Sequence, residues 1–488
     1  MKRVISNYNI SMGDKYFNIV LTPQQRNAFS RIQVFVKDPN SRVFILRGYA
    51  GTGKTTLMSG LIKWLKSEKV LFTSLASTGR AAKVLSDKTK ETARTVHSQI
   101  YLFKDLNQDI QSVRDNVPET AMHASGQLSL VFDLKTNLTE DETVYIVDEA
   151  SMISDKVVTS GSFSKYGSGN LLQDLLNHDK KGKFIFVGDP CQLPPIDQEF
   201  SPALDTAHLS STYKIPVQSS DLTDIVRQQK GNGIIEASLK LRNLYTNRSY
   251  QKWANLPIKG HSNITILNSQ LTLINDYIRN IKANGFANAT MICQTNKHCF
   301  ELNQIIRKAV MPQSDLVQIG DMLIVTQNNY VAPFVNGDLV IVTEINERIF
   351  RAGLNFVNIK VRGVNGTSEY AVLLIENILT SSQTNIDQRK NTDLLIDYHE
   401  RMKKRGFNQK SAEFRQNMMF DPYLNALKAN YGYALTCHKC QGGEWNEVYL
   451  HLDNKILGIP QPGVYQWWYT AVTRAKNRLF AANDWFIK

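Results

Sequence analysis

Short apolar runs alternate with longer stretches of helical periodicity in the first part of the chain. The apolar runs cover residues 43–46, 70–74, 144–147 and 184–187. Strands that alternate with helices in this way form a parallel sheet with the helices packed on its faces. Three further runs, at residues 264–267, 290–294 and 447–452, predict a second α/β lobe.

The pattern changes between residues 319 and 379, where short strands are separated by Asn336-Gly337-Asp338 and by Val364-Asn365-Gly366. Such turn sequences are typical of β-hairpins and predict a small all-β insert. The polar segment 381–416, which contains Lys403-Lys404-Arg405, predicts a solvated helical arm. Another polar segment, 101–137, interrupts the first lobe, and residues 160–170 read as a flexible Gly/Ser loop.

Composition limits the class of protein. A chain of 488 residues is too long for one core and predicts about three or four domains. No apolar run reaches the roughly 18 residues of a membrane span, and residues 1–17 lack the apolar region of a signal peptide. We therefore expect no membrane partner and a reducing, cytoplasmic setting.

Five cysteines are few and odd in number, which argues against a disulfide framework. The pair in Cys437-His438-Lys439-Cys440 is half of a zinc site, but no second such pair exists, so both cysteines read as small residues within another motif. The net charge of +13 and the pI near 9.3 favour a polyanionic partner. Nucleic acid is the usual one.

The segment Gly48-Tyr49-Ala50-Gly51-Thr52-Gly53-Lys54-Thr55 follows a predicted strand and opens a predicted helix. This is the setting of a phosphate-binding loop, in which backbone N–H groups and the helix N-terminus surround the phosphates. Lys54 would place its charge on the β- and γ-phosphates, and the Thr55 hydroxyl would bind Mg²⁺. The sequence therefore predicts that ATP and Mg²⁺ are bound here.

Two further polar motifs also follow predicted strands. Asp148-Glu149 comes after residues 144–147, and we expect that strand to lie beside the strand of the phosphate loop. Asp148 is then placed to hold Mg²⁺ and Glu149 to accept a proton from the attacking water. Gln192 lies in the proline-rich segment after residues 184–187 and is predicted to sense the γ-phosphate.

These motifs, taken in order over nearly the whole chain, resemble the superfamily 1 helicases, and specifically the RecD/Dda-like branch (superfamily 1B). The resemblance implies an α/β fold class with two RecA-like parallel-sheet lobes. The first lobe would comprise residues 1–97 and 141–218, and the second residues 219–311 and 426–488. A hairpin insert for strand separation would occupy residues 98–140, and an SH3-like β insert with the helical arm would occupy residues 312–425.

The resemblance also assigns residues to the nucleotide. Gln25, in Leu21-Thr22-Pro23-Gln24-Gln25, would pair with the adenine. Arg227 and Arg474 would reach the γ-phosphate and complete the site when the lobes close, while Gly443 and Glu444 would lie near the ribose. Together with the loop, the implied nucleotide set is Gln25, Gly51, Thr52, Gly53, Lys54, Thr55, Thr56, Gly443 and Glu444.

A second implied set contacts the nucleic-acid strand. It comprises Ser77, Thr78, Arg80 and His97 in the first lobe, and Thr295, Asn296, Lys297, Asn336, Thr436, His438 and Lys439 in the rest of the chain. Ser77 stands where the family commonly has proline. Tyr101, Phe103 and Phe132 are the candidate wedge residues of the hairpin insert, and Trp467-Trp468 reads as core rather than as a stacking platform.

The resemblance implies an ATP-dependent DNA helicase that moves 5′ to 3′ on single-stranded DNA and unwinds a duplex with a 5′ tail. We expect it to work as a monomer, alongside replication or recombination proteins. Two alternatives stay open: a strand-stimulated ATPase that translocates or remodels protein–DNA complexes, and a nucleotide-gated subunit of a larger complex. RNA is a less favoured substrate, because phosphate contacts do not report the sugar.

Overall fold

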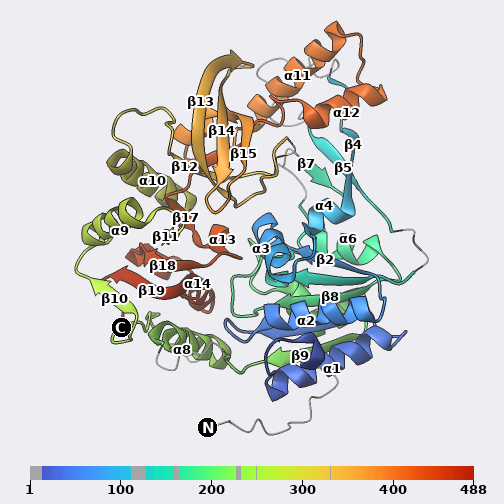
Figure 1. Cartoon of the computed structure of the whole chain (residues 1–488), viewed down its shortest axis with the longest axis vertical. Helices are drawn as coiled ribbons and strands as arrows, with labels where there is room; N and C mark the ends of the chain where they lie inside the picture. The colour runs from blue at the N-terminus through green and yellow to red at the C-terminus, as the bar shows by residue number, and fades with distance from the viewer. Residues whose placement is uncertain are drawn as a thin grey trace, which may run out of the picture. The chain divides into compact units, whose positions relative to one another are not determined.

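The structure, a computed structural model, describes residues 14–110, 128–137, 139, 141–158, 164–226, 232–248, 250–329, 331–383 and 385–488. The chain divides into two compact units. The first comprises Met1–Ile100, Lys135–Val157 and Asn170–Lys230, and the second Tyr101–Leu134, Val158–Gly169 and Gly231–Lys488. Each is described by itself (Figure 1).

The first unit is built on a parallel six-stranded sheet in the order β3-β2-β6-β8-β1-β9. Its strands are β1 (Val43–Gly48), β2 (Phe72–Ala76), β3 (Ala93–Thr95), β6 (Val144–Asp148), β8 (Lys183–Gly188) and β9 (Val217–Leu222). Its helices are α1 (Pro23–Lys37), α2 (Lys54–Ser67), α3 (Gly79–Thr89), α4 (Val96–Ile100), α6 (Leu171–His178) and α7 (Thr206–Tyr213). The predicted first α/β lobe is confirmed.

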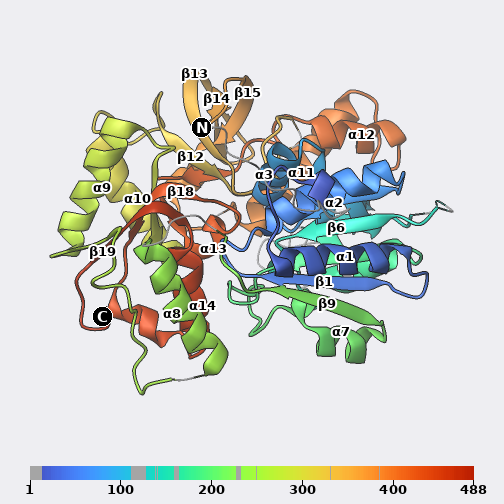
Figure 2. The same cartoon turned by 60° about the horizontal axis from the view of Figure 1, so that its bottom comes forward.

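One core of the first unit lies between the sheet and the helices α1 and α2, which Figure 2 shows alongside β1 and β6. Phe29 and Ile32 of α1 and Leu61 of α2 pack against Phe44 of β1 and Ile146 of β6. Each of these residues is at most 1% exposed. The three-to-four-residue spacing of apolar positions in α1 therefore fixes which face of that helix meets the sheet.

The second unit contains the second predicted lobe, a parallel sheet in the order β10-β19-β18-β11-β17. Its strands are β10 (Ile264–Leu267), β11 (Ala289–Cys293), β17 (Ala434–Thr436), β18 (Trp445–Leu450) and β19 (Ala475–Ala482). Its helices are α8 (Gly233–Asn247), α9 (Gln270–Asn284), α10 (Asn296–Val310), α13 (Cys437–Cys440) and α14 (Gly463–Val472). This lobe too follows the prediction.

The β insert of the second unit is an antiparallel sheet in the order β15-β14-β13-β12-β16. Its strands are β12 (Met322–Val325), β13 (Leu339–Arg351), β14 (Leu354–Gly363), β15 (Glu369–Ile375) and β16 (Ala429–Tyr431). The turn at Val364-Asn365-Gly366 joins two strands as predicted. Asn336-Gly337-Asp338 instead ends a long connection, and the tight hairpin is formed by Ala352-Gly353, whose φ angles are 48° and 69°.

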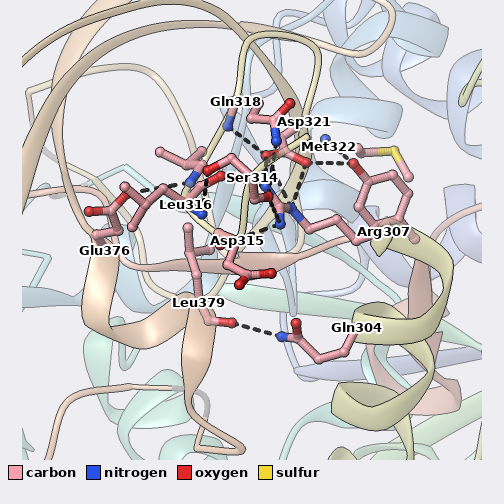
Figure 3. A network of polar contacts seen from close by, with 12 residues as sticks. Gln304, Arg307, Ser314, Asp315, Leu316, Gln318, Asp321, Met322, Glu376 and Leu379 are labelled. Atoms are coloured by element: carbon pink, nitrogen blue, oxygen red, sulfur yellow. Dashed lines mark hydrogen bonds and ion pairs between the residues drawn. The ribbon is translucent and has the colours of Figure 1, made fainter. Parts of the chain in front are cut away.

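A buried ionic network joins α10 to the start of this insert (Figure 3). The Arg307 guanidinium donates to both oxygens of the Asp321 carboxylate, at 3.0 Å and 2.9 Å, and to the Ser314 carbonyl at 3.0 Å. The Tyr433 hydroxyl donates to Asp321 at 2.8 Å, and the Arg307 and Asp321 side chains are 5% and 0% exposed. Because the guanidinium and the carboxylate are both hydrogen-bonded, this buried ion pair holds α10 against the insert.

A small three-stranded sheet in the order β4-β5-β7 forms the hairpin insert. It comprises β4 (Tyr101–Leu106), β5 (Leu130–Leu134) and β7 (Ser164–Tyr166). The predicted flexible loop at 160–170 was wrong in its described part, because β7 pairs in parallel with β5 and Tyr166 stacks on Phe132 at 4.7 Å. Local Gly/Ser composition gave no sign of this long-range pairing.

The helical arm consists of α11 (Gln388–Lys404) and α12 (Ala412–Phe420). The prediction of a solvated arm was wrong, since Leu394, Leu395, Tyr398 and Met402 are all buried. Charged residues on the outer face of α11 masked this apolar face. Among the residues described, no helix is long and apolar enough to cross a membrane.

Candidate nucleotide and nucleic-acid sites

The phosphate loop has the backbone that its sequence predicts. Gly51 and Gly53 adopt φ angles of 79° and 83°, which glycine tolerates at low cost. A Cβ at Gly48 would lie 2.7 Å from Thr52 Oγ1 and 2.9 Å from Lys54 Cγ. The loop therefore needs glycine both for its turns and for its close packing.

Lys54 begins α2, and its ammonium donates to the carbonyls of Gly48 at 2.6 Å and Tyr49 at 3.1 Å. These bonds hold the charge over the loop. Thr55 and Thr56 occupy the first turn of the same helix and are half-buried. Backbone N–H groups at the start of a helix lack intrahelical acceptors, so this end of α2 favours anions.

Gln25 is buried at 2% exposure and forms a capping box with Thr22 at the start of α1. Its Oε1 accepts from the Thr22 N–H at 3.0 Å, and its Nε2 donates to the Thr52 carbonyl at 2.9 Å. The amide thus supports the phosphate loop directly. Its predicted pairing with adenine stays a prediction.

Asp148 ends β6 and lies at the same carboxyl edge of the sheet as the phosphate loop. Contrary to our expectation, β6 is not beside β1, because β8 lies between them. Burial and the adjacent Glu149 carboxylate raise the pKa of Asp148 to about 7, against partial opposition from Lys54 and Lys88. Glu149 adopts a φ of 50°, a left-handed conformation that is costly for a residue with a Cβ.

The donor set at this edge is a hydroxyl and two neighbouring carboxylates. Oxygen ligands of this kind are those that Mg²⁺ prefers, and a cation would offset the burial and the Glu149 repulsion that raise the pKa of Asp148. The residues therefore fit a magnesium ion held through Thr55 and Asp148.

Gln192 follows β8 in a loop built around Asp189, which is fully buried. The Cys191 N–H donates to the Asp189 carboxylate at 2.9 Å, and the Gln192 N–H donates to the Asp189 carbonyl at 3.2 Å. The Gln192 side chain is 4% exposed. The loop thus has a fixed course beside the strand that separates β1 from β6.

The predicted strand-contact residues of the first unit follow β2 and β3 at this carboxyl edge. The Ser77 N–H donates to the Asp148 carbonyl at 3.3 Å, and Thr78 caps α3 by accepting from the Ala81 N–H at 3.2 Å. Arg80 lies in the first turn of α3. Burial lowers the pKa of His97, so this histidine is uncharged at neutral pH.

Arg227 lies outside the described residues, but the segment before it is fixed. The Val226 N–H donates to the Gly51 carbonyl at 3.0 Å. Gln24 accepts from the Thr223 N–H at 2.8 Å and donates to its hydroxyl at 2.7 Å. Sequence reasoning missed this supporting role of Gln24, although its place next to Gln25 was the available signal.

In the second unit, two predicted strand-contact motifs meet at one edge because their strands are neighbours. Strand β11 pairs in parallel with β17, with Cys293 opposite Thr436. The first motif, Thr295-Asn296-Lys297, is exposed and opens α10, with Thr295 accepting from the His298 N–H at 3.1 Å. The second, Thr436 with His438 and Lys439, opens α13.

Burial lowers the pKa of both His438 and Lys439. His438 is therefore neutral at pH 7 and suited to hydrogen bonding rather than to charge pairing. Asn336 lies elsewhere, in the connection between β12 and β13, where its N–H donates to Asn328 Oδ1 at 2.9 Å. Among the described residues, no hydrogen bond or ion pair joins Asn336 to either motif.

Arg474 follows α14 and is 5% exposed. Its guanidinium donates to the carbonyls of Thr470 at 3.0 Å and Gly443 at 3.2 Å, and Glu444 lies 3.8 Å from Lys476. The structure thus brings Arg474, Gly443 and Glu444 together. Trp467 and Trp468 are 2% and 0% exposed, which agrees with the core role expected for them.

The hairpin aromatics are largely interior. Tyr101 and Phe132 are 8% and 7% exposed, and Phe103 packs edge-on to Phe132 at 5.5 Å. Across the described strands β4, β5 and β7, the large apolar side chain that is exposed is Leu102, at 65%. A wedge must present apolar surface to the bases, so Leu102 replaces the aromatics as the candidate.

All five cysteines lie in described positions and none forms a disulfide; Cys437 and Cys440 are buried. Within the described part of the chain, no group of three or more His, Cys, Asp or Glu side chains is arranged to hold a metal ion. Cys437 instead donates to the Trp467 carbonyl at 3.6 Å.

Comparisons with known proteins agree with the order of these motifs. The AAA domain family matches residues 20–255, and the UvrD-like helicase C-terminal domain family matches residues 431–481. The RecD2 DNA helicase of Deinococcus radiodurans is 25% identical over 474 residues, which cover 94% of this chain and 50% of that protein. The chain therefore spans about half the length of that relative.

Two other curated relatives are matched over more of their length. The Dda helicase of Enterobacteria phage T4 is 26% identical over 362 residues, covering 72% of each chain. The RecD subunit of the RecBCD enzyme of Buchnera aphidicola is 23% identical, covering 96% of this chain and 75% of that one. A solved Bacteroides Pif1 helicase, bound to ADP-AlF3 and single-stranded DNA, aligns with a TM-score of 0.48 at 16% identity, covering 96% and 94%.

Proposed function

We propose that this chain, which belongs to the superfamily 1B DNA helicases of the RecD/Dda-like branch, uses ATP hydrolysis to move 5′ to 3′ along single-stranded DNA and to unwind duplex DNA. One observation carries the proposal. The Lys54 loop, the Asp148-Glu149 pair and the strand-contact residue Ser77 share one carboxyl edge of one sheet. In this proposal, the hydrogen bond from the Ser77 N–H to the Asp148 carbonyl, at 3.3 Å, links the nucleotide site to the strand contact.

In this proposal the phosphate loop binds the triphosphate and Lys54 supplies charge to its β- and γ-phosphates. Glu149 orients the attacking water and accepts its proton, and Gln192 reads the γ-phosphate. Mg²⁺, held through Thr55 and Asp148, would neutralise charge on the phosphate oxygens. Phosphoryl transfer consists mostly of such electrostatic positioning.

Arg227 and Arg474 are proposed to add positive charge at the γ-phosphate, with Gly443 and Glu444 near the ribose. The role proposed for Arg474 is supported by its hydrogen bond to the Gly443 carbonyl, because this bond holds the arginine beside the residues proposed to contact the ribose. A difference in affinity for ATP and ADP between two conformations would then convert hydrolysis into movement along the strand.

Single-stranded DNA is proposed to contact Ser77, Thr78, Arg80 and His97 in the first unit and the Thr295 and Thr436 motifs in the second. The Ser77 hydroxyl supports this proposal, since it is buried without a hydrogen-bond partner in the described residues. A buried polar atom of this kind is costly unless a ligand satisfies it. Both histidines are neutral, so they would contact the strand through hydrogen bonds.

The remaining properties are inferred from the family resemblance and stay proposals. They are movement in the 5′ to 3′ direction, a 5′-tailed duplex as the substrate, action as a monomer, and work beside replication or recombination proteins in the cytoplasm. A translocase that remodels protein–DNA complexes is the alternative outcome. It differs from a helicase only in lacking a working wedge.

Leu102→Ala is the substitution that tests the wedge. We expect unwinding of a 5′-tailed duplex to fall by roughly tenfold, because one exposed apolar side chain would no longer displace base stacking worth about 1.4 kcal/mol per step. Strand-stimulated ATP turnover should stay within about twofold. Both are measured on the same preparation, one by strand-displacement fluorescence and the other by phosphate release.

Lys104→Ala is the matched control, because Lys104 lies on the same strand, is exposed, and pairs with exposed Asp133 at 2.7 Å. It should leave both rates unchanged. If wild-type protein hydrolyses ATP but unwinds nothing, the translocase alternative replaces the helicase proposal. Equal unwinding by wild type and Leu102→Ala would remove Leu102 from the proposal.

A further inference from the structure

The hairpin sheet and the helical arm, far apart in sequence, share one hydrophobic core in the second unit. The hairpin side contributes Leu106, Ile110 and Leu128, which are 8%, 0% and 0% exposed. The arm contributes Leu395, Tyr398, Met402, Phe414 and Met418. Figure 1 shows α11 and α12 beside the hairpin strands. Hairpin and arm are therefore one structural element.

Polar contacts fix the turn between α11 and α12 on the end of β4. The Ile110 N–H donates to Gln409 Oε1 at 2.8 Å, and Gln409 Nε2 donates to the Gln108 carbonyl at 3.0 Å. Arg415 pairs with Asp105 at 3.3 Å. Because β4 runs from Tyr101 to Leu106, these contacts hold the turn at the distal end of that strand.

Some basic residues of the arm are paired with carboxylates. Arg401 contacts both Asp397, at 2.9 Å, and Asp421, while Lys390 pairs with Asp393 and Arg415 with Asp105. A second group, which we term the basic turn, comprises Lys403, Lys404, Arg405 and Lys410. All four are exposed, and none has a carboxylate within ion-pair distance in the described residues.

The basic turn therefore presents four cations on a support that is itself fixed to the hairpin. A solvated charge run would need no such support. The nearest acidic residues in the sequence, Glu400 and Glu413, leave the stretch strongly positive. Four exposed cations within eight residues concentrate positive charge, which the phosphates of a nucleic-acid backbone attract.

We propose that the basic turn binds backbone phosphates of the duplex that enters the hairpin, and so holds the fork against the wedge. This inference rests on the proposed function, because it requires the hairpin to be the place where strands part. It assigns duplex DNA rather than the tracked single strand, since the turn is fixed to the hairpin rather than to the Thr295 and Thr436 motifs. Because the basic turn would contact phosphates and not bases, we expect its binding to be independent of DNA sequence.

The test compares wild type with K403Q/K404Q/K410Q, which leaves Arg405 in place because its guanidinium lies over the Phe407 ring at 5.4 Å. Binding is measured by fluorescence anisotropy for a 5′ single strand alone and for the same strand ending in a duplex. We expect affinity for the tailed duplex to fall roughly tenfold, with a salt slope lower by about one per lysine that contacts phosphate. Affinity for the single strand should stay unchanged.

Two controls keep the result interpretable. K252Q/K259Q/K308Q removes three exposed charges elsewhere in the same unit and should alter neither affinity. K403R/K404R/K410R keeps the charge and should bind like wild type. A folded glutamine variant that shows wild-type affinity and salt slope for the tailed duplex would overturn the inference, as would an equal loss on both DNAs.

Failure of the proposed function would look different. In that case wild-type protein would show no strand-stimulated ATP turnover and no unwinding, whatever the basic turn does. A wild type that unwinds together with a glutamine variant that binds forks normally would leave the function intact and remove only the inference.

Discussion

Lys54→Ala should reduce strand-stimulated ATP turnover by about 100-fold to 1,000-fold, while the affinity for single-stranded DNA stays unchanged. The Lys54 ammonium is the only side-chain cation of the phosphate loop, and it lies over the Gly48 and Tyr49 carbonyls. Its loss removes charge stabilisation that water cannot replace in a half-enclosed site. Phosphate release and fluorescence anisotropy measure the two properties.

The matched control for this prediction is Lys63→Ala. Lys63 lies on the same helix, α2, but is exposed and away from the loop. It should retain wild-type turnover. A folded Lys54→Ala variant with normal turnover would show that the phosphate loop is not the hydrolytic site.

Arg307→Met should destabilise the second unit by about 3–5 kcal/mol, because the substitution leaves the Asp321 carboxylate buried without its partner. Asp321 is fully buried and keeps only the Tyr433 hydroxyl and the Gln318 N–H, at 2.8 Å and 2.7 Å, once Arg307 is gone (Figure 3). Denaturant-dependent amide hydrogen exchange of α10 and β12 in the full chain reports the loss locally.

Lys360→Ala provides the comparison. Its partner Glu344 lies 2.6 Å away, but the two side chains are 41% and 43% exposed. Water therefore screens the pair, and we expect a much smaller loss of stability. Equal effects of the two substitutions would contradict the view that burial, rather than pairing itself, sets the cost.

The two parallel-sheet lobes could be predicted because their strands are short apolar runs and their helices are periodic. The phosphate loop was predictable in detail. Its glycines indicated positions with positive φ angles, and Gly51 and Gly53 adopt such angles. The position of the site at the carboxyl edge of the sheet was also predictable, because all parallel strands of one sheet end at that edge. Thus Asp148, Gln192 and Ser77 could be placed at one edge before their distances were known.

Pairings between distant segments could not be predicted. Strand β8 enters between β1 and β6 through a crossover, and β7 joins the hairpin through a parallel pairing with β5. Strand β9 extends the first sheet to Leu222, beyond the boundary predicted at residue 218. The sequence near each strand does not indicate which strand it pairs with.

The wedge and the arm illustrate the same point for side chains. Tyr101 and Phe132 suggested an aromatic wedge, but Tyr166, brought in by β7, packs against both rings. The arm read as solvated because its charges are frequent. Its apolar face is visible only once Leu106 and Ile110 of the hairpin are known to cover it.

We expect ATP hydrolysis at the Lys54 loop to drive strand separation from a 5′ tail. The decisive measurement is the unwinding of two partial duplexes, one with a 5′ single-stranded tail and one with a 3′ tail, with ATP turnover followed in parallel. We expect unwinding from the 5′ tail alone, with turnover stimulated by both DNAs. Unwinding from the 3′ tail alone, or turnover without unwinding of either DNA, would contradict this expectation.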